Sequence, residues 1–438
     1  MTETYDCIII GGGPGGATVA TLLADMGHKV LVIERGNFPR FHIGESLMPE
    51  TYWTFKRLGM LPKLRASNFV KKYSVQFVNG SGKESQPFYF DEMNPHECSQ
   101  TWQVVRSEFD KMMLENAAEH GAEVWQNGNV NEVIFEKSAH DTLPRATGVV
   151  VTREGQEPIR LNCKVVVDAT GTSALISKRL KIRDPDPRLR KASIFAHYKG
   201  ARRDSGKNEG ATLVLATQNQ EGWFWFIPLP DDVSSIGVVA DPDVLIGRGT
   251  PEQMLEEQIK KCPGLDGRME NARRVSPVHV LSDFTYRANR AAGEGWVLIG
   301  DAFGFLDPIY SSGVFLALKS GEMAADAINE GLEKNDLSGA QLGKWAEMIC
   351  DGMHAIRKLV YAYYTRGFSF GQFMRAHPQY KKNLVDLLIG DVFRLEVNAI
   401  FEPMSKEVPL PEAVPLAATP GAEDSPRRHG GTEALVGR

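Results

Sequence analysis

Three glycines near the start of the chain are spaced as in loops that bind the phosphates of a dinucleotide. Gly11, Gly13 and Gly16 form a G-x-G-x-x-G pattern that encloses Pro14 and Gly15. In such loops the first glycine permits a tight turn, the second lets the backbone approach a pyrophosphate, and the third lets the helix pack on the strand. The N-terminal amides of the helix then face the phosphates. Because glycine-rich turns are common, the pattern indicates a dinucleotide site only when a strand precedes it and a helix follows it.

The flanking segments have the types that the loop requires. Residues 5–10 are short and β-branched, residues 14–26 are rich in Ala and Leu, and residues 29–33 form a second apolar run. Strand, helix and parallel strand in about 30 residues is the unit of nucleotide-binding sheets. Glu34 lies 21 positions beyond Gly13, where a carboxylate can bind ribose hydroxyls. We predict a dinucleotide site here, the alternative being a purely structural turn.

Two later segments narrow the choice of dinucleotide. Residues 165–171 read Val-Val-Val-Asp-Ala-Thr-Gly and residues 297–302 read Val-Leu-Ile-Gly-Asp-Ala, each an apolar run that ends in a turn of small residues. With these motifs in this order, residues 5–330 resemble the FAD-dependent oxidoreductases of the aromatic-hydroxylase, geranylgeranyl-reductase and halogenase superfamily. The resemblance implies FAD as cofactor. It implies that the turn formed by Asp168, Ala169 and Gly171 packs by the nucleotide end of FAD. It also implies that the Gly300-Asp301 turn provides a carboxylate that binds the ribityl chain.

The same resemblance assigns further cofactor contacts. Arg106, which opens a predicted helix, resembles the family's arginine near the FAD phosphates, and the alternative is an ordinary surface arginine. Residues 38–46 read Phe-Pro-Arg-Phe-His-Ile-Gly-Glu-Ser and resemble the halogenase form of the segment that passes the flavin. Geranylgeranyl reductases place a cysteine in this turn, and none occurs here. The other residues expected at the cofactor are Arg35, Arg40, Glu45, Ser46, Gly313 and Val314.

Two tryptophans give the most specific indication of chemistry. Trp223 and Trp225 belong to a Trp-x-Trp-x-Ile-Pro segment, which resembles the signature of flavin-dependent halogenases. In a strand both side chains project to one face. The resemblance implies an aromatic barrier that keeps the acceptor away from the flavin, so that oxygen transfer goes to halide. The alternative is a strand with ordinary core aromatics.

Ser312 and Gly313 precede a predicted helix, and amides at a helix N-terminus favour anions. In halogenases the matching pair holds the halide beside the flavin, which the resemblance implies here. An ordinary helix cap and a contact with the flavin pyrimidine are the alternatives.

Halogenases also need a lysine between flavin and substrate. Hypohalous acid travels to this lysine, which either hydrogen-bonds it or forms a haloamine. Lys71 and Lys72 precede Tyr73, and Lys72 aligns best with the family's Lys-Tyr-Gly segment, although Ser74 replaces the glycine. Since strand side chains alternate, Lys71 is expected to be solvated. The alternative for Lys72 is a solvated surface lysine.

One departure bears on the acceptor. Tryptophan halogenases carry a glutamate three residues before the glycine that corresponds to Gly313. In this chain that position is Tyr310. The resemblance therefore implies an acceptor of the phenol or pyrrole kind, or a carrier-linked acyl group. Residues 354–373 interleave aromatic and basic residues, which fits a substrate lid, a carrier-docking surface, a membrane-touching surface or a helix packed on the core.

The predicted fold class is α/β. We expect a Rossmann-like FAD-binding domain of the glutathione-reductase type, formed by residues 1–75, 100–190 and 275–340. An inserted, mainly antiparallel β substrate domain covers residues 76–99 and 191–274, and a helical region covers residues 341–402. Residues 403–438 are crowded with Pro, Ala, Gly and charge, which predicts a disordered tail.

Composition limits the remaining choices. The 438 residues carry a net charge of −5 and a pI near 6.1, which argues against a nucleic-acid partner. No apolar run approaches the roughly 18 residues of a transmembrane segment. The five cysteines have no disulfide or metal-ligand spacing, and no secretory signal is visible. We expect a cytoplasmic enzyme without a metal.

Together these features predict a halogenase that uses FAD reduced by a separate flavin reductase, oxygen, and chloride or bromide. A flavin monooxygenase or a geranylgeranyl-reductase-like enzyme on the same scaffold is the first alternative, because function depends on the site rather than the fold. A flavoprotein that binds or senses without turnover is the second.

Overall fold

The short apolar runs around the glycine loop belong to one mixed sheet, whose centre is parallel. The computed structural model describes residues 4–93, 95–282 and 284–418. Five strands run parallel in the order β20, β10, β1, β2 and β7. Their carboxyl ends therefore meet at one edge, where ligands of open parallel sheets bind. The bounds are Thr4–Ile10 for β1, Val30–Ile33 for β2, Glu123–Trp125 for β7, Ile159–Asp168 for β10 and Trp296–Leu298 for β20.

Two helices that pack on this sheet begin at that same edge. α1 (Pro14–Asp25) and α8 (Ser312–Lys334) lie against each other. A Cβ atom on Gly15 would stand 3.1 Å from the carbonyl oxygen of Ala317, and one on Gly321 would stand 3.3 Å from the Cβ of Thr18. Early residues of α1 thus meet early residues of α8, so the helices run parallel. Both positive helix ends lie at the carboxyl edge of the sheet.

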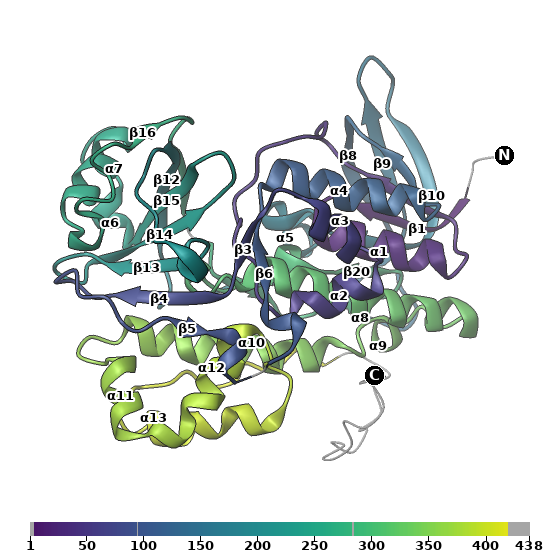
Figure 1. Cartoon of the computed structure of the whole chain (residues 1–438). Coiled ribbons are helices and arrows are strands. Elements are labelled where there is room, and N and C mark those ends of the chain that lie inside the picture. The colour runs from purple at the N-terminus through teal and green to yellow at the C-terminus, as the bar shows by residue number, and fades with distance from the viewer. Residues whose placement is uncertain (1–3, 94, 283, 419–438) are drawn as a thin grey trace.

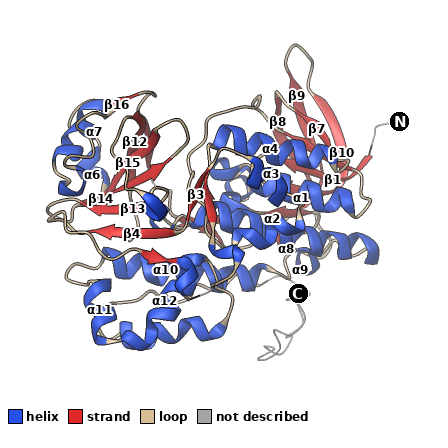
Figure 2. Ribbon diagram, in the orientation of Figure 1, coloured by secondary structure: helices blue, strands red, loops and turns tan. Residues whose placement is uncertain are grey.

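A second sheet, drawn at the left of Figures 1 and 2, carries the tryptophan segment. Its order is β16, β12, β15, β14, β13, β4 and β5, with β17 also paired to β12. The pairs are antiparallel except for that of β13 with β4. The bounds are Ser74–Val78 (β4), Phe88–Tyr89 (β5), Ala192–Lys199 (β12), Thr212–Ala216 (β13), Gly222–Pro228 (β14), Val233–Ala240 (β15), Arg273–Arg274 (β16) and His279–Ser282 (β17).

This sheet extends past the limit predicted at residue 274. β17 pairs with β12 from Phe195–His279 to Ala192–Ser282, so residues 279–282 belong to the second sheet rather than to the first. The rings of Phe195 and His279 also stack at 5.3 Å. The sequence misplaced this boundary because an edge strand carries fewer apolar residues than a central one.

The two faces of the second sheet belong to different cores. Trp223 and Trp225 join the large core that includes the first sheet. Phe224 and Phe226 join a smaller core under helices α6 (Pro242–Leu245) and α7 (Pro251–Lys260). This alternation confirms that both tryptophans lie on one face, the face that contributes to the large core.

A glycine makes room for the second tryptophan. Gly237 on β15 is the register partner of both Trp225 and Phe195. A Cβ atom there would stand 2.3 Å from the indole ring of Trp225 and 2.4 Å from the Cβ of Phe195. The indole therefore fills the space that any larger residue at 237 would take.

Three further strands extend the first sheet through antiparallel pairs: β19 (Ala292–Gly293) pairs with β20, β9 (Arg145–Arg153) pairs with β10, and β8 (Gly128–Glu136) pairs with β9. The other elements connect or cover the two sheets. They are α2 (Thr51–Arg57), α3 (Leu61–Ala66), β3 (Val70–Lys72), β6 (Thr101–Gln103), α4 (Arg106–Glu119), α5 (Leu175–Arg179), β11 (Arg183–Pro185), β18 (Tyr286–Ala288) and β21 (Gly304–Phe305).

The C-terminal region is helical, as predicted, and lies below the second sheet in Figure 1. In its longest helix, α10, the side chains of Ile356, Leu359 and Val360 are buried and belong to the large core. Of the alternatives for residues 354–373, the structure has a helix packed on the core. The bounds are Gly339–Leu342 (α9), Ala346–Tyr364 (α10), Phe370–Ala376 (α11), Lys381–Ile389 (α12) and Phe401–Met404 (α13).

The predicted disordered tail is ordered over its first part, so that prediction was wrong for residues 403–418. Val408 is buried, and three arginines donate hydrogen bonds to the tail's carbonyl oxygens. Arg357 binds that of Glu412 (3.1 Å), Arg287 that of Pro415 (3.1 Å) and Arg290 that of Ala418 (3.2 Å). Residues 419–438 lie outside the described residues.

A substitution at Gly237 tests the packing of the tryptophan face. Gly237→Ala should lower the free energy of unfolding by about 1–3 kcal/mol, as overpacking does, because the new methyl group overlaps the Trp225 indole. Urea denaturation measures this effect. Gly371→Ala is the control, since its Cβ would meet nothing nearer than 3.8 Å. Equal stability of the two variants would contradict the prediction.

Candidate functional site

The glycine loop follows β1 and is held against the end of β10. Gly11 has φ of +108°, and a Cβ atom on it would stand 2.4 Å from the carbonyl oxygen of Ala169. A Cβ atom on Gly16 would stand 2.0 Å from the carbonyl oxygen of Gly11. Both positions therefore require glycine on steric grounds, which fits the roles predicted for the first and third glycines.

The middle of the loop is open. A Cβ atom on Gly13 would meet only the Arg40 guanidinium, 3.7 Å away. The N-terminus of α1 has no side-chain cap and no acidic residue in its first turn. Free amides, an open cradle and a neighbouring cation together suit an anionic pyrophosphate.

Glu34 at the end of β2 braces this loop. Its carboxylate accepts hydrogen bonds from the amides of Gly12 (2.9 Å) and Gly36 (2.8 Å). Arg40 lies 3.7 Å from Glu34 and 3.2 Å from Asp110. Arg35 is exposed and reaches the hydroxyl of Ser173 at 3.5 Å, in the turn after β10. Arg40 thus lies beside the loop, and Arg35 beside the turn after β10.

Arg106 is buried and is not a surface arginine. It donates to both carboxylate oxygens of Asp110, at 2.7 and 3.0 Å, and to the carbonyl oxygens of Ile43 and Gly44. A Cβ atom on Gly44, whose φ is +101°, would stand 2.9 Å from this guanidinium. Arg106 therefore fixes the turn that leads to Glu45 and Ser46.

Asp168, which ends β10, and Asp301, which follows β20, have different surroundings. Asp168 accepts hydrogen bonds from the Thr170 hydroxyl (2.7 Å) and amide and from the Ile176 amide (2.7 Å), so its carboxylate holds the turn at Ala169 and Gly171. The Asp301 carboxylate has no such bond among the described residues. Burial raises the pKa of Asp301 to about 6, although the charge of Arg106 lowers it. Gly300 before it has φ of +52°.

Lys72 lies inside the protein, whereas Lys71 is exposed, as strand alternation predicted. β3 pairs with β6, and the Lys72 ammonium donates to the Ser46 hydroxyl (2.9 Å) and the Leu47 carbonyl oxygen (3.0 Å). It also lies 5.6 Å from the centre of the Phe90 ring. Only 4% of Lys72 is exposed, and burial lowers its pKa to about 7. The surface-lysine alternative is therefore wrong.

Glu45 and Ser46 connect this lysine to the second sheet. Ser46 hydrogen-bonds the Thr212 hydroxyl on β13 (2.9 Å), and Glu45 Oε1 lies 2.6 Å from His197 Nε2 on β12. Burial opposes protonation of His197, but the hydrogen bond and charge of Glu45 outweigh it and raise the pKa of His197. Glu45 Oε2 is buried without a partner among the described residues. A buried acceptor normally has a donor, so a donor on a bound cofactor fits this position.

The aromatic barrier, which we define as Trp223 and Trp225, is buried and hydrogen-bonded. The two rings lie 6.3 Å apart. The Trp225 indole donates to the Ser235 hydroxyl (3.1 Å), and the Trp223 indole donates to the Tyr364 hydroxyl (2.8 Å).

Ser312 and Gly313 form the first turn of α8. Ser311 before them is in the left-handed conformation, with φ of 57°, and caps the helix without its side chain. No acidic residue lies in the first turn. The Gly313 position faces Phe305, whose ring would stand 3.1 Å from a Cβ atom. Val314 is buried beside it, and the hydroxyl of Tyr310 donates to the Leu359 carbonyl oxygen (3.1 Å).

The predicted residues gather in two neighbouring groups. The glycine loop, Glu34, Arg40 and Arg106 surround the carboxyl edge near α1, and Arg106 links them to the second group through the turn at Gly44. That second group joins Glu45, Ser46 and Lys72 to the face of the second sheet. Sequence reasoning gave no role to His197, Thr212, Tyr364 or Asp307. Tyr364 belonged to an aromatic cluster and Asp307 stands just before the Ser312-Gly313 segment, whereas His197 and Thr212 had no signal because their partners are far away in the chain.

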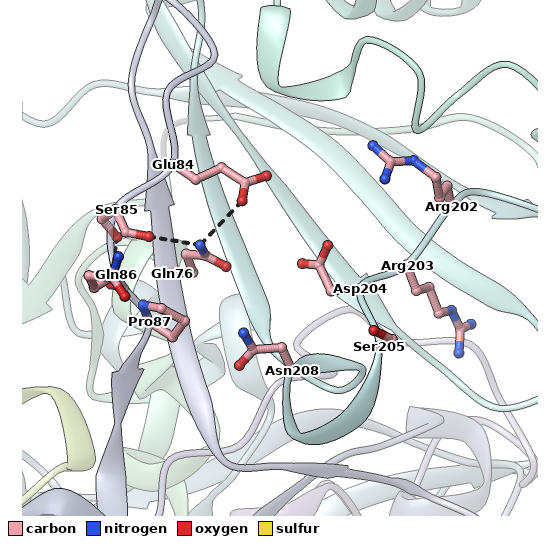
Figure 3. Close-up of a pocket in the computed structure, with 10 residues that line it drawn as sticks. All are labelled: Gln76, Glu84, Ser85, Gln86, Pro87, Arg202, Arg203, Asp204, Ser205 and Asn208. Carbon is pink, nitrogen blue, oxygen red and sulfur yellow. Dashed lines mark hydrogen bonds between the residues drawn. The ribbon is translucent and has the colours of Figure 1, made fainter.

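A cavity of the second sheet lies elsewhere. It has a volume of about 510 Å³ and lies between β4, the turn after it and residues 202–208 (Figure 3). Gln76 on its wall is the register partner of Leu213, which belongs to the smaller core. The cavity thus opens on the face of the second sheet away from the tryptophans, and its lining contains none of the predicted site residues. No cluster of metal-ligating residues occurs within the described ranges.

Comparison with known proteins agrees with this geometry. The family described as "FAD binding domain" matches residues 4–331. The chain is 31% identical to a 1H-pyrrole-2-carbonyl-[peptidyl-carrier protein] chlorinase of Pseudomonas fluorescens, over 90% of this chain and 91% of the relative. It is 33% identical to the corresponding brominase of Pseudoalteromonas luteoviolacea, over 90% and 94%. The solved structure of the flavin-dependent brominase Bmp2 matches with a TM-score of 0.82 and 31% identity, over 92% of this chain and 99% of that chain.

The chain therefore belongs to the FAD-dependent halogenases, and its cofactor is FAD. The halogenase prediction is favoured over the monooxygenase and reductase alternatives. Among the described residues, no helix is long and apolar enough to cross a membrane.

A pH titration tests the role expected of Asp301. Its carboxylate, if it accepts hydrogen bonds from the ribityl hydroxyls, should bind FAD best when ionised. The dissociation constant for FAD should therefore rise about tenfold as the pH falls through 6, the loss of one hydrogen bond to a charged group. Flavin fluorescence measures this. Asp301→Asn should bind FAD weakly at all pH values. Asp351→Asn changes an exposed residue of α10, and its affinity for FAD should vary with pH as in the unsubstituted protein. A flat titration would contradict the role.

Proposed function

We propose that this protein halogenates an electron-rich aromatic ring, with a pyrrole linked to a carrier protein as the first candidate acceptor. Hypohalous acid formed beside FAD reaches Lys72, which presents the halogen to the ring. The observation that carries this proposal is the buried ammonium of Lys72, held by Ser46 and Leu47 in the segment that also provides Glu45.

The environment of Lys72 suits both ways of handling hypohalous acid. With a pKa near 7, the side chain is present near neutrality as an ammonium and as an amine. The ammonium donates a hydrogen bond to the acid's oxygen. The amine forms a haloamine and releases water, then transfers the halogen to the ring and takes the ring's proton. Burial keeps water away from either species.

FAD, when bound and reduced, supplies the two electrons that reduce oxygen. The chain's own residues select what receives the oxidising equivalent. The first-turn amides of Ser312 and Gly313 stabilise an anion, which suits chloride or bromide. Trp223 and Trp225 exclude the acceptor from the flavin side. In sum, one halide, one oxygen molecule, one proton, reduced FAD and an aromatic C–H give a C–halogen bond, oxidised FAD and two water molecules.

The acceptor class rests on two supports. The relatives that match over most of their length act on pyrrole groups carried by a protein, as their names state. Tyr310 occupies the position of the glutamate of tryptophan halogenases. A phenol is the second candidate, because the Lys-Tyr pair at residues 72–73 resembles the phenol type. We also propose that a separate flavin reductase supplies reduced FAD, and that the reaction takes place in the cytoplasm.

Product analysis tests the reaction itself. The protein, supplied with reduced FAD, oxygen and bromide, should convert carrier-linked pyrrole, free pyrroles or phenols to products with the isotope pattern of bromine. Mass spectrometry detects it. A product that gains oxygen or two hydrogens without any dependence on halide would overturn the proposal.

Substitution of Lys72 tests its role in transfer. Lys72→Ala should oxidise reduced FAD at nearly the same rate but halogenate at least about 100-fold more slowly, the usual contribution of one positioned acid–base group. Lys71→Ala is the matched control, because it removes the neighbouring but exposed lysine. Normal halogenation by Lys72→Ala would show that the assigned role is wrong.

The pH dependence of the unchanged enzyme separates the two forms of transfer. A halogenation rate that rises through pH 7 requires the neutral amine and the haloamine route. A rate that falls through pH 7 requires the ammonium and the hydrogen-bond route.

A further inference from the structure

A row of hydrogen bonds joins three parts of the chain beside the aromatic barrier. The Trp223 indole on β14 donates to the Tyr364 hydroxyl on α10 (2.8 Å), and that hydroxyl donates to Asp307 Oδ2 (3.0 Å). The other oxygen of Asp307 accepts from the Ile309 amide (3.0 Å). The second sheet, the C-terminal helices and the loop before α8 therefore meet at one tyrosine hydroxyl.

Both ends of this row are buried, and neighbouring side chains surround its middle. Trp223 and Asp307 are each 1% exposed. The ring of Tyr363 meets Trp223 edge-on at 6.3 Å and Tyr364 edge-on at 5.5 Å. The Lys191 ammonium lies 4.2 Å from the centre of the Tyr364 ring and is paired with Asp241. Every member of the row has its partner, and a satisfied buried network is rigid because each lost bond leaves a polar group unpaired.

Asp307 also shapes the approach to Ser312. It caps the short turn of residues 308–310 through the Ile309 amide. Ser311 follows in the left-handed conformation, and α8 begins at Ser312. The same carboxylate therefore holds Tyr364, and through it Trp223, while it fixes the turn that leads to the anion-binding end of α8.

We propose that Tyr364 and Asp307 are positioning residues for halogenation, which hold the aromatic barrier and the halide-binding turn in one fixed arrangement. This inference rests on the proposed function of Trp223, Ser312 and Gly313. When the arrangement loosens, water enters, and the oxidising equivalent leaves as hydrogen peroxide: reduced FAD and oxygen then give oxidised FAD and hydrogen peroxide, without halide.

The main test removes one hydroxyl group. Tyr364→Phe in the FAD-loaded protein should still oxidise reduced FAD within about twofold of the unchanged rate. Its ratio of hydrogen peroxide to brominated product should rise about tenfold, the effect expected of one unpaired buried polar group. The bromide concentration for half-maximal halogenation should rise as well.

Tyr361→Phe is the matched control. It removes a hydroxyl from the same helix, but one that bonds to Asp186 rather than to Asp307. Asp307→Asn keeps an acceptor oxygen for Tyr364, so its ratio of hydrogen peroxide to brominated product should stay close to that of the unsubstituted protein. Asp307→Ala should raise this ratio as Tyr364→Phe does. If Tyr364→Phe behaves like Tyr361→Phe, the inference is overturned.

A double substitution tests whether the tyrosine acts through the tryptophan. If it does, Tyr364→Phe should add little to the peroxide yield of Trp223→Phe, since coupled residues are not additive. Fully additive effects would contradict the row as a unit.

Two readouts do not depend on halogenation. The first is the hydrogen peroxide yield without halide or acceptor, and the second is acrylamide quenching of tryptophan emission. Tyr364→Phe should raise the quenching, and this rise should vanish in a Trp223→Phe background. If the unsubstituted protein makes no halogenated product, the proposed function is refuted. These two readouts would still support or overturn the positioning role of Tyr364 and Asp307.

Discussion

The need to pair one buried ammonium group constrains much of this site. Lys72 loses most of its hydration inside the protein, and a buried cation is tolerated only when nearby oxygens replace water. Those oxygens come from Ser46 and Leu47, so the segment that passes the cofactor must lie against β3 and β6. Ser46 in turn bonds to Thr212, and Glu45 reaches His197. The segment that holds the lysine thus also contacts the second sheet.

Much of the fold followed from local patterns in the sequence. The glycine loop, the runs after it and the Gly300-Asp301 turn each depend on residues close in the chain, so their spacing was sufficient to predict the parallel sheet. Strand alternation separated Lys72 from Lys71 and put Trp223 and Trp225 on one face. The family resemblance added the reaction, which no spacing rule contains.

The parts that sequence reasoning missed are contacts between distant segments. His197 lies 152 positions from Glu45, and Tyr364 lies 141 positions from Trp223. A histidine or tyrosine at such a position carries no local mark of its partner. The boundary at residue 274 failed for a similar reason, because β17 is defined by its pairing with β12 rather than by its own composition.

The ordered part of the tail illustrates a different kind of recognition. Arg287, Arg290 and Arg357 contact the tail through its backbone carbonyl oxygens. The side chains that these arginines also bind, Cys350, Asp141 and Asp186, lie outside the tail. Every amino acid offers the same carbonyl group, so this attachment asks only that the chain follow a given path. Most side chains of residues 412–418 can therefore change without loss of these three bonds, although Leu416 also packs against the large core. Loss of any of the three arginines removes a contact that no change in the tail can replace.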